Sequence, residues 1–216
     1  MGESRSREPR GEAKVAITMA KQGRDHHHRL ETITQTLQGA GKILPPVHLW
    51  NPPYCGEIDM RVAADGTWYY QDTPIARPAL VRLFASVLKR EGERYYLVTP
   101  VEKCGIQVDD APFLAVDLQA EGSGAGRTLR FRTNMDEDVL CGRDHPLRFA
   151  PQPGGGLKPY LHVRADLWAL ATRPVYYELV ELGEERETGR GRWFGVCSQG
   201  EFFAMAPASE LDGLTA

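Results

Sequence analysis

The chain has 216 residues, of which 42% are hydrophobic and 25% charged, and this composition excludes wholesale disorder. The formal net charge is −3, and because residues 1–30 carry a local charge of +3, the remainder of the chain sums to −6. A mildly acidic body argues against duplex nucleic acid as the main partner. No stretch approaches the ~20 apolar residues of a membrane span and no secretory signal is present, so we expect a cytoplasmic protein that does not bind membranes.

The first 44 residues lack the pattern of a packed domain. Residues 1–28 are polar and show no hydrophobic period, which predicts a disordered leader. The leader contains His26, His27 and His28, but three adjacent residues cannot converge on a metal ion from rigid elements, and no metal site is predicted. Residues 29–44 are expected to form a short helix and linker, because apolar residues repeat there at helical spacing.

A β-hairpin is the clearest structural pattern in the chain. Ile58, Met60 and Val62 alternate with polar residues, and Asp65-Gly66 predicts a two-residue type I′ turn. Such a turn would pair Val62 with Tyr69 and place both on the core face together with Ile58 and Met60. The opposite face, polar and aromatic at once, would present Asp59, Arg61, Trp68 and Tyr70.

A helix and a buried strand should follow this hairpin. Pro78 suits the first turn of a helix, and apolar residues then recur at i, i+3, i+4, i+7 and i+8, at Leu80, Leu83, Phe84, Val87 and Leu88. Gly92 is expected to end the helix. Residues 95–98 are typical of a buried strand.

The second half of the chain is predicted to be mostly β. Residues 113–118 and 128–133 flank a glycine-rich segment, which indicates a hairpin. In the second of these strands Arg130 and Arg132 alternate with apolar residues and should face solvent. Residues 151–159 are expected to form a loop.

Two weak sequence matches suggest an internal repeat. Residues 77–83 match residues 164–170, and each match is followed by a double-tyrosine segment, at 95–98 and at 176–180, that resembles a strand. Residues 62–69 match residues 196–203 at a different offset. Either these matches are coincidental or the chain contains a duplicated α+β unit, and the duplication is the favoured interpretation. We therefore predict the α+β class, with an N-terminal α+β domain at 45–100 and a C-terminal, β-rich domain at 101–210.

The charged and aromatic face of the first hairpin is the best candidate for binding. Arginine presents a planar fork of donors that suits phosphate or carboxylate, and aromatic rings stack on flat ligands. The alternative is that this face packs against another domain, with Asp59 paired to Arg61 or Arg77. Both interpretations remain open at this point.

A cysteine-dependent hydrolase is a third hypothesis. The four cysteines contain no CxxC pair, and we expect them to be reduced. Cys55 lies in a proline-rich segment and is the best candidate nucleophile, with His145 or His162 as its base. Nothing in the sequence brings these residues together, so catalysis is not the expected function.

Several motifs resemble the proteobacterial family known as domain of unknown function (DUF) 1285. They are Pro52-Pro53-Tyr54-Cys55-Gly56-x-Ile58-Asp59-Met60-Arg61, Asp65-Gly66-Thr67-Trp68, Thr99-Pro100-Val101-Glu102-Lys103, Asp110-Ala111-Pro112-Phe113, Thr133-Asn134, His145-Pro146-Leu147, Pro159-Tyr160-Leu161, Val175-Tyr176-Tyr177-Glu178-Leu179-Val180 and the hairpin from Gly195 to Phe203. The resemblance covers residues 45–205. It implies two small α+β domains related by duplication, the second one similar to pleckstrin-homology-like barrels, with a small nucleotide-like ligand bound between them and a role in signalling.

The leading hypothesis is therefore a non-enzymatic protein that binds a small anionic or nucleotide-like ligand between its domains, without a cofactor or a metal. Arg61, Lys103 and Arg164 would hold the anion, and an aromatic side chain would stack on a ring. The full set of predicted ligand-binding residues is Tyr54, Asp59, Arg61, Trp68, Glu102, Lys103, Asn134, Tyr160 and Arg164. The alternative is an interaction adaptor that binds a peptide segment of a protein partner, by strand addition to an exposed sheet edge.

Overall fold

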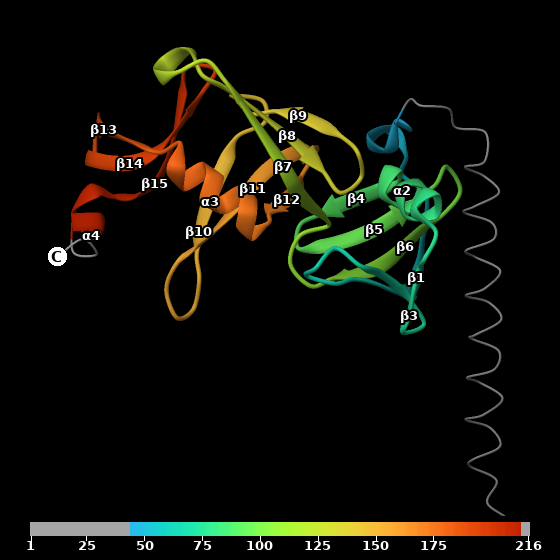
Figure 1. Cartoon of the computed structure of the whole chain (residues 1–216). Coiled ribbons are helices and arrows are strands. Elements are labelled where there is room, and N and C mark those ends of the chain that lie inside the picture. The colour runs from blue at the N-terminus through green and yellow to red at the C-terminus, as the bar shows by residue number, and fades with distance from the viewer. Residues whose placement is uncertain (1–43, 213–216) are drawn as a thin grey trace, which may run out of the picture.

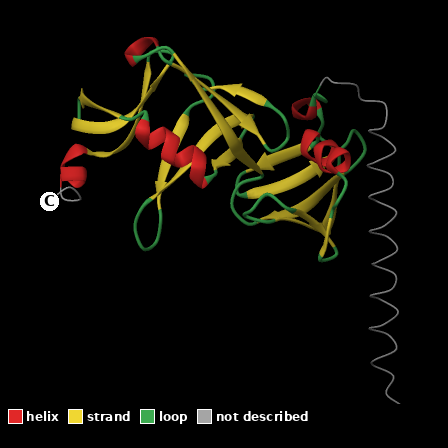
Figure 2. Ribbon diagram, viewed as in Figure 1, coloured by secondary structure: helices red, strands yellow, loops and turns green. Residues whose placement is uncertain are grey.

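The computed structural model describes residues 44–212, so the predicted leader, its three histidines and the predicted helix lie outside the described residues. Within this range the strands form three sheets, which follow one another along the molecule from the blue-green N-terminal part to the red C-terminal part (Figure 1). Strands dominate and the helices are short (Figure 2). The α+β class is thus confirmed.

The first sheet has six strands in the order β3-β2-β1-β6-β5-β4. Its central strands β1 and β6 run parallel, and the other neighbours are antiparallel. The 3₁₀ turn η1 precedes the sheet, and α2 connects β3 to β4. The bounds are η1 Val47–Leu49, β1 Tyr54–Val62, β2 Trp68–Tyr70, β3 Thr73–Pro74, α2 Pro78–Ser86, β4 Leu88–Glu91, β5 Arg94–Val98 and β6 Lys103–Val108.

The second sheet repeats this strand order. It reads β10-β11-β12-β7-β8-β9, so in both sheets the first and sixth strands along the chain form the central parallel pair. The remaining neighbours are antiparallel. The bounds are β7 Phe113–Glu121, η2 Gly124–Gly126, β8 Thr128–Thr133, β9 Asp138–Leu140, β10 Leu147–Pro151, β11 Leu157–Arg164 and β12 Leu167–Ala171.

A smaller, antiparallel sheet of three strands completes the described chain. Helix α3 leads from β12 to this sheet, and α4 follows it, with bounds α3 Arg173–Glu181, β13 Glu184–Thr188, β14 Gly191–Ser198, β15 Glu201–Pro207 and α4 Ala208–Asp212. Buried side chains of all three sheets belong to one hydrophobic cluster. None of the helices among residues 44–212 has the length and apolar character that crossing a bilayer requires.

The first hairpin forms as predicted, but its register differs by one residue. Gly66, at φ +82°, follows a turn in which its N–H donates to the Ala63 carbonyl over 2.9 Å, so the loop has three residues rather than two. Val62 consequently pairs with Trp68, and Arg61 pairs with Tyr69. A one-residue slip moves every side chain of a strand to the other face. Trp68 is therefore a core residue, and the prediction that it shares the outer face with Arg61 is wrong.

Helical and strand periods were assigned correctly in some segments and wrongly in others. The hairpin of β7 and β8 and the strand at 95–98 are confirmed, and Arg130 and Arg132 are exposed. Leu88, however, begins β4 rather than ending a helix. The double tyrosine at 176–177 lies in α3, where Val175 and Leu179 bury the face that packs on the core. Side chains four residues apart share one helical face, which the strand interpretation overlooked.

The sequence matches at offset 87 do not connect equivalent elements. Residues 77–83 lie at the start of α2, whereas residues 164–170 run from the end of β11 into β12. The predicted boundary between residues 100 and 101 would also divide the first sheet, because β6 pairs with β1 and β5. The chain passes from the first sheet to the second at residues 109–112. The likeness of the two sheets therefore lies in their strand order and not in the matches that suggested a repeat.

Candidate functional site

All three cations that were expected to hold an anion are already paired with carboxylates. Arg61 forms an ion pair of 2.7 Å with Asp109, and its guanidinium lies 4.7 Å from the centre of the Tyr69 ring. Lys103 contacts Glu91 at 2.9 Å. Arg164 binds the carboxylate of Glu137 through Nη1. An incoming anion would have to displace a carboxylate at each of these positions.

Tyr54 and Lys103 are brought together on the outer face of the first sheet. Both lie against Tyr96: the Tyr54 ring meets it edge-on at 6.0 Å, and the Lys103 ammonium is 5.0 Å from its centre. The Tyr54 hydroxyl donates to Glu57 over 2.6 Å, and Arg94 forms an ion pair with the same carboxylate. The polar groups of Tyr54, Glu57 and Arg94 are therefore bonded to one another.

The remaining predicted residues of the first sheet do not join that network. Asp59 is exposed on β1. Trp68 is 1% exposed and stacks on Phe84 of α2, with 6.4 Å between the ring centres, so its ring is not accessible to a ligand. Glu102 lies in the turn between β5 and β6, where its N–H donates to the Thr99 hydroxyl over 3.2 Å. These three side chains therefore lie apart, one exposed on a strand, one in the core and one in a turn.

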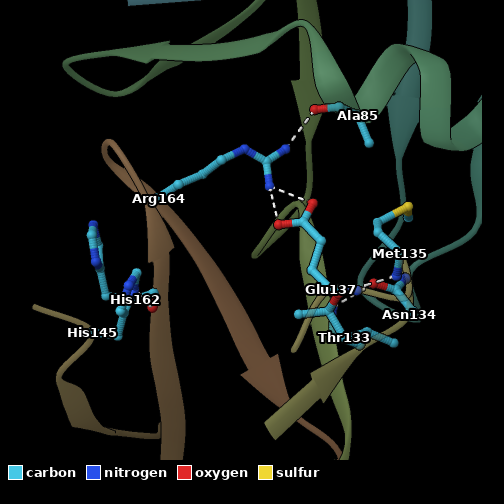
Figure 3. Close-up of polar contacts among 9 residues, drawn as sticks. Ala85, Thr133, Asn134, Met135, Glu137, His145, His162 and Arg164 are labelled. Carbon is cyan, nitrogen blue, oxygen red and sulfur yellow. Dashed lines mark hydrogen bonds and ion pairs between the residues drawn. The ribbon is translucent and has the colours of Figure 1, made fainter. Parts of the chain in front are cut away.

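Arg164 and Asn134 instead join the two larger sheets to each other. From the end of β11, Arg164 reaches toward Glu137 and donates to the Ala85 carbonyl of α2 over 2.8 Å (Figure 3). The Asn134 side chain accepts a hydrogen bond of 3.0 Å from the Leu114 N–H, and Gly66 of the first hairpin packs directly against both residues. These residues hold the junction between the sheets, and their polar groups are used in doing so.

Tyr160 is also at this junction. Its hydroxyl donates to Asp110 over 2.7 Å, and the other oxygen of that carboxylate accepts from Lys158 over 2.6 Å. Asp110 belongs to the segment that connects the two sheets. Burial of the ring, together with the hydrogen bond to Asp110, raises the pKa of Tyr160 well above its usual range, so the hydroxyl is a hydrogen-bond donor at neutral pH.

A basic and aromatic cluster around Arg148 was missed by the sequence analysis. Arg148, on β10, lies 4.9 Å from the centre of the Tyr160 ring and 4.3 Å from that of Trp168. Its guanidinium forms no ion pair with any carboxylate among residues 44–212. The pairing of Arg148 with Tyr160 and of His162 with Trp168 across three strands creates this cluster, so only the register could have revealed it.

The first sheet meets this cluster through Tyr95. Burial raises the pKa of the Tyr95 hydroxyl, while the nearby charges of Arg90 and Arg148 oppose that rise. Arg90 lies 5.5 Å from the centre of the Tyr95 ring and forms an ion pair of 3.5 Å with Asp166 of the second sheet. Arg90 is therefore paired across the junction, whereas the N–H groups of Arg148 are not paired with a carboxylate of the described residues.

The histidines proposed for a hydrolase are engaged elsewhere. His162 places Nδ1 3.0 Å from the Asp144 carbonyl oxygen and Nε2 2.5 Å from that of Ala165. Nδ1 of His145 contacts the His162 carbonyl oxygen at 3.2 Å. Cys55 lies in the other sheet, where its thiol donates to the Pro53 carbonyl. Cys55 therefore forms no pair with His145 or His162. No cluster of His, Cys, Asp or Glu able to hold a metal ion occurs among the described residues.

The cysteines should differ sharply in reactivity. Cys104, Cys141 and Cys197 are buried, and burial raises the pKa of Cys141 to about 12 and that of Cys197 to about 11. Because the thiolate is the reactive form, only the half-buried Cys55 should react quickly with Ellman's reagent at pH 8. We expect one fast equivalent per native chain, absent in Cys55→Ser, and four equivalents in denaturant. A second fast equivalent in the native protein would contradict this assignment.

The fold and the junction define a class: an α+β protein of two six-stranded sheets of equal strand order, joined by ion pairs and aromatic contacts. Two family models together match residues 45–205. The model of the N-terminal domain of DUF1285, a domain of unknown function, matches residues 45–111. The model of the C-terminal domain of DUF1285, described as a protein of unknown function, matches residues 112–205. The chain belongs to the DUF1285 family.

Two solved structures are similar to this chain. A DUF1285 family protein from Silicibacter pomeroyi DSS-3 shares 51% identity with a TM-score of 0.77, and the match covers 82% of this chain and 96% of that one. A DUF1285 family protein from Shewanella baltica OS155 shares 29% identity with a TM-score of 0.45, covering 57% and 91% respectively. A search of curated proteins finds no match.

Proposed function

We propose that the protein is a cytoplasmic, non-enzymatic binder of a small anionic ligand with a flat ring, and that the ligand is held at the junction beside Arg148. One observation carries the proposal: Arg148 is exposed, is held over two aromatic rings and is not neutralised by a carboxylate of the described residues. Arg61, Lys103 and Arg164 are each neutralised. Arg148 therefore replaces them as the proposed anion-binding group.

The chemistry of Arg148 favours a phosphate or a carboxylate. A guanidinium that lies on aromatic faces keeps the N–H donors at its edge directed outward, in a fork that matches two oxygens of one anion. Tyr160 and Trp168 restrict the rotation of the side chain, so less conformational entropy is lost when an anion binds. Tyr95 and Trp168, both half-buried, offer ring faces to the flat part of the ligand.

A role in signal transduction is part of the proposal. Tyr160 contacts both Arg148 and Asp110, and Asp110 lies in the segment that connects the two sheets. A ligand that moves Arg148 would act on this segment through Tyr160. The second candidate is the adaptor, and it is supported by β13, which has a free edge in the sheet formed by the described strands.

A thermal-shift screen against nucleotides, dinucleotides and anionic metabolites tests the proposal. A ligand at about 100 times its dissociation constant should stabilise the protein by about 2.7 kcal/mol. For any hit, Arg148→Lys keeps the charge but loses the fork of donors. The dissociation constant should therefore rise about tenfold, which corresponds to a loss of about 1.4 kcal/mol in binding free energy.

Arg130→Lys is the matched control, because Arg130 is also exposed on a strand of the second sheet and its side chain makes no ion pair with the described residues. Its affinity should equal that of the unaltered protein. Unchanged affinity in Arg148→Lys would remove Arg148 from the site. A screen without any hit would favour the adaptor.

We also propose that the two larger sheets arose by duplication. The support is their common strand order with a parallel central pair, which two unrelated sheets would have no reason to share. The similarity of the second unit to pleckstrin-homology-like barrels stays a prediction.

A further inference from the structure

A cavity of about 530 Å³ lies beside the second sheet, and none of the residues predicted to bind a ligand lines it. Its walls come from the turn between β10 and β11, the start of β11, the end of β12 and the first two turns of α3. Cavities of about 300–1,000 Å³ are the size that small organic ligands occupy.

The charges that line this cavity are all positive. Lys158 and Arg173 are its ionisable cations, and no carboxylate lines it, although the protein as a whole carries a charge of −3. Lys158 is paired with Asp110, which is outside the lining. The Arg173 guanidinium is exposed and makes no ion pair or hydrogen bond that involves the described residues. An unneutralised guanidinium at the wall of a cavity attracts an anion.

The remaining walls suit an apolar, flat body. Leu157 and Leu170 supply apolar surface, and the rings of Tyr176 and Tyr177 lie 6.1 Å apart on α3. Glycines of the β10–β11 turn have left-handed φ values, and no atom would lie within 4 Å of a side chain added there, so this side of the cavity is open for entry. The lining thus combines a cationic part with an aromatic and aliphatic part.

We propose that this cavity binds a small organic anion, a carboxylic acid or a phosphate monoester with a flat apolar body. The anionic group contacts Arg173, which is not neutralised by a carboxylate of the described residues, and the apolar body lies against Leu170 and Tyr176. This site is separate from the one at Arg148: Arg148 does not line the cavity. Asp110 connects the two sites, because it contacts Lys158 of the cavity and Tyr160 of the junction.

Calorimetric titration with three simple probes tests the site. Benzoate and phenyl phosphate carry the required anion on a ring, and benzyl alcohol is the neutral comparison. We expect at least one of the two acids to bind about tenfold or more tightly than the alcohol. Arg173→Met, which keeps an unbranched side chain but removes the guanidinium and its charge, should weaken the binding of that acid about tenfold or more. The melting midpoint without a probe should be unchanged, because Arg173 makes no polar contact within residues 44–212 that the substitution would break.

Arg130→Met is the control: it removes another exposed arginine, on β8 and outside the cavity lining, and should leave the binding of the acid unaltered. Three results would overturn the proposal: no saturable binding of either acid up to about 10 mM, equal binding of benzyl alcohol, or equal loss of affinity in the two variants.

Discussion

Replacing Gly66 by valine should lower the free energy of unfolding by about 3–4 kcal/mol, from two additive causes. Gly66 has a φ of +82°, which a β-branched residue adopts only with strain. A side chain at this position would also begin 2.8 Å from Asn134 Nδ2 and 2.9 Å from a methyl carbon of Leu114. Asn134 cannot turn away without losing its hydrogen bond to the Leu114 N–H. Urea denaturation midpoints measure the loss.

Gly92→Val separates the two causes. Gly92 also has a left-handed φ, +61°, but no atom would lie within 4 Å of an added Cβ. This variant should show the strain alone, about 1–2 kcal/mol. The additional loss in Gly66→Val then reports the close approach of the first hairpin to the second sheet. Equal losses in the two variants would mean that this approach contributes nothing to stability.

Removing Arg164 should be nearly as damaging. Arg164→Met leaves the Glu137 carboxylate, which is only 28% exposed, without its cation and deprives the Ala85 carbonyl of a donor. It also removes a guanidinium that lies 4.8 Å from the centre of the Phe113 ring. Breaking a buried pair from one side costs about 3–5 kcal/mol, and partial exposure of both groups reduces this to about 2–3 kcal/mol.

Arg132→Met is the matched control for this prediction. Arg132 pairs with Asp117 at 3.6 Å on the solvent face of β8, with side-chain exposures of 53% and 40%, and its loss should cost less than about 0.5 kcal/mol. In Arg164→Met the additional change Glu137→Leu should restore part of the stability, because no carboxylate remains unpaired. If Arg164→Met proved as mild as Arg132→Met, Arg164 would be free for the ligand role that the sequence suggested.

Both predictions concern the same junction, which has consequences for the proposed function. Gly66, Asn134 and Arg164 hold the two larger sheets together through contacts that leave their polar groups engaged. Arg148 lies at that junction with its donors available. In the proposed ligand site, Gly66, Asn134 and Arg164 would therefore maintain the shape of the junction, and Arg148 would supply the positive charge.

The sequence by itself determined the class of fold and much of its local structure. Alternation of apolar and polar residues identified β1 and β8, and a helical period starting at Pro78 identified α2. The outward direction of Arg130 and Arg132 also followed from alternation. The family resemblance was based on short sequence motifs, and membership of the family is confirmed. These features depend on residues a few positions apart, so they can be recognised without knowing the rest of the structure.

Only the tertiary structure decided the register and the partners. A third loop residue in the first hairpin moved Trp68 into the core, because strand pairing shifts whole faces at once. Residues 176–180 became helical because Val175 and Leu179 bury one helical face against the core. The carboxylates that neutralise Arg61, Lys103 and Arg164 lie 12 to 48 positions away along the chain, and the aromatic rings beside Arg148 come from two other strands. Which charge meets which partner depends on long-range packing, which the local pattern of residues does not encode.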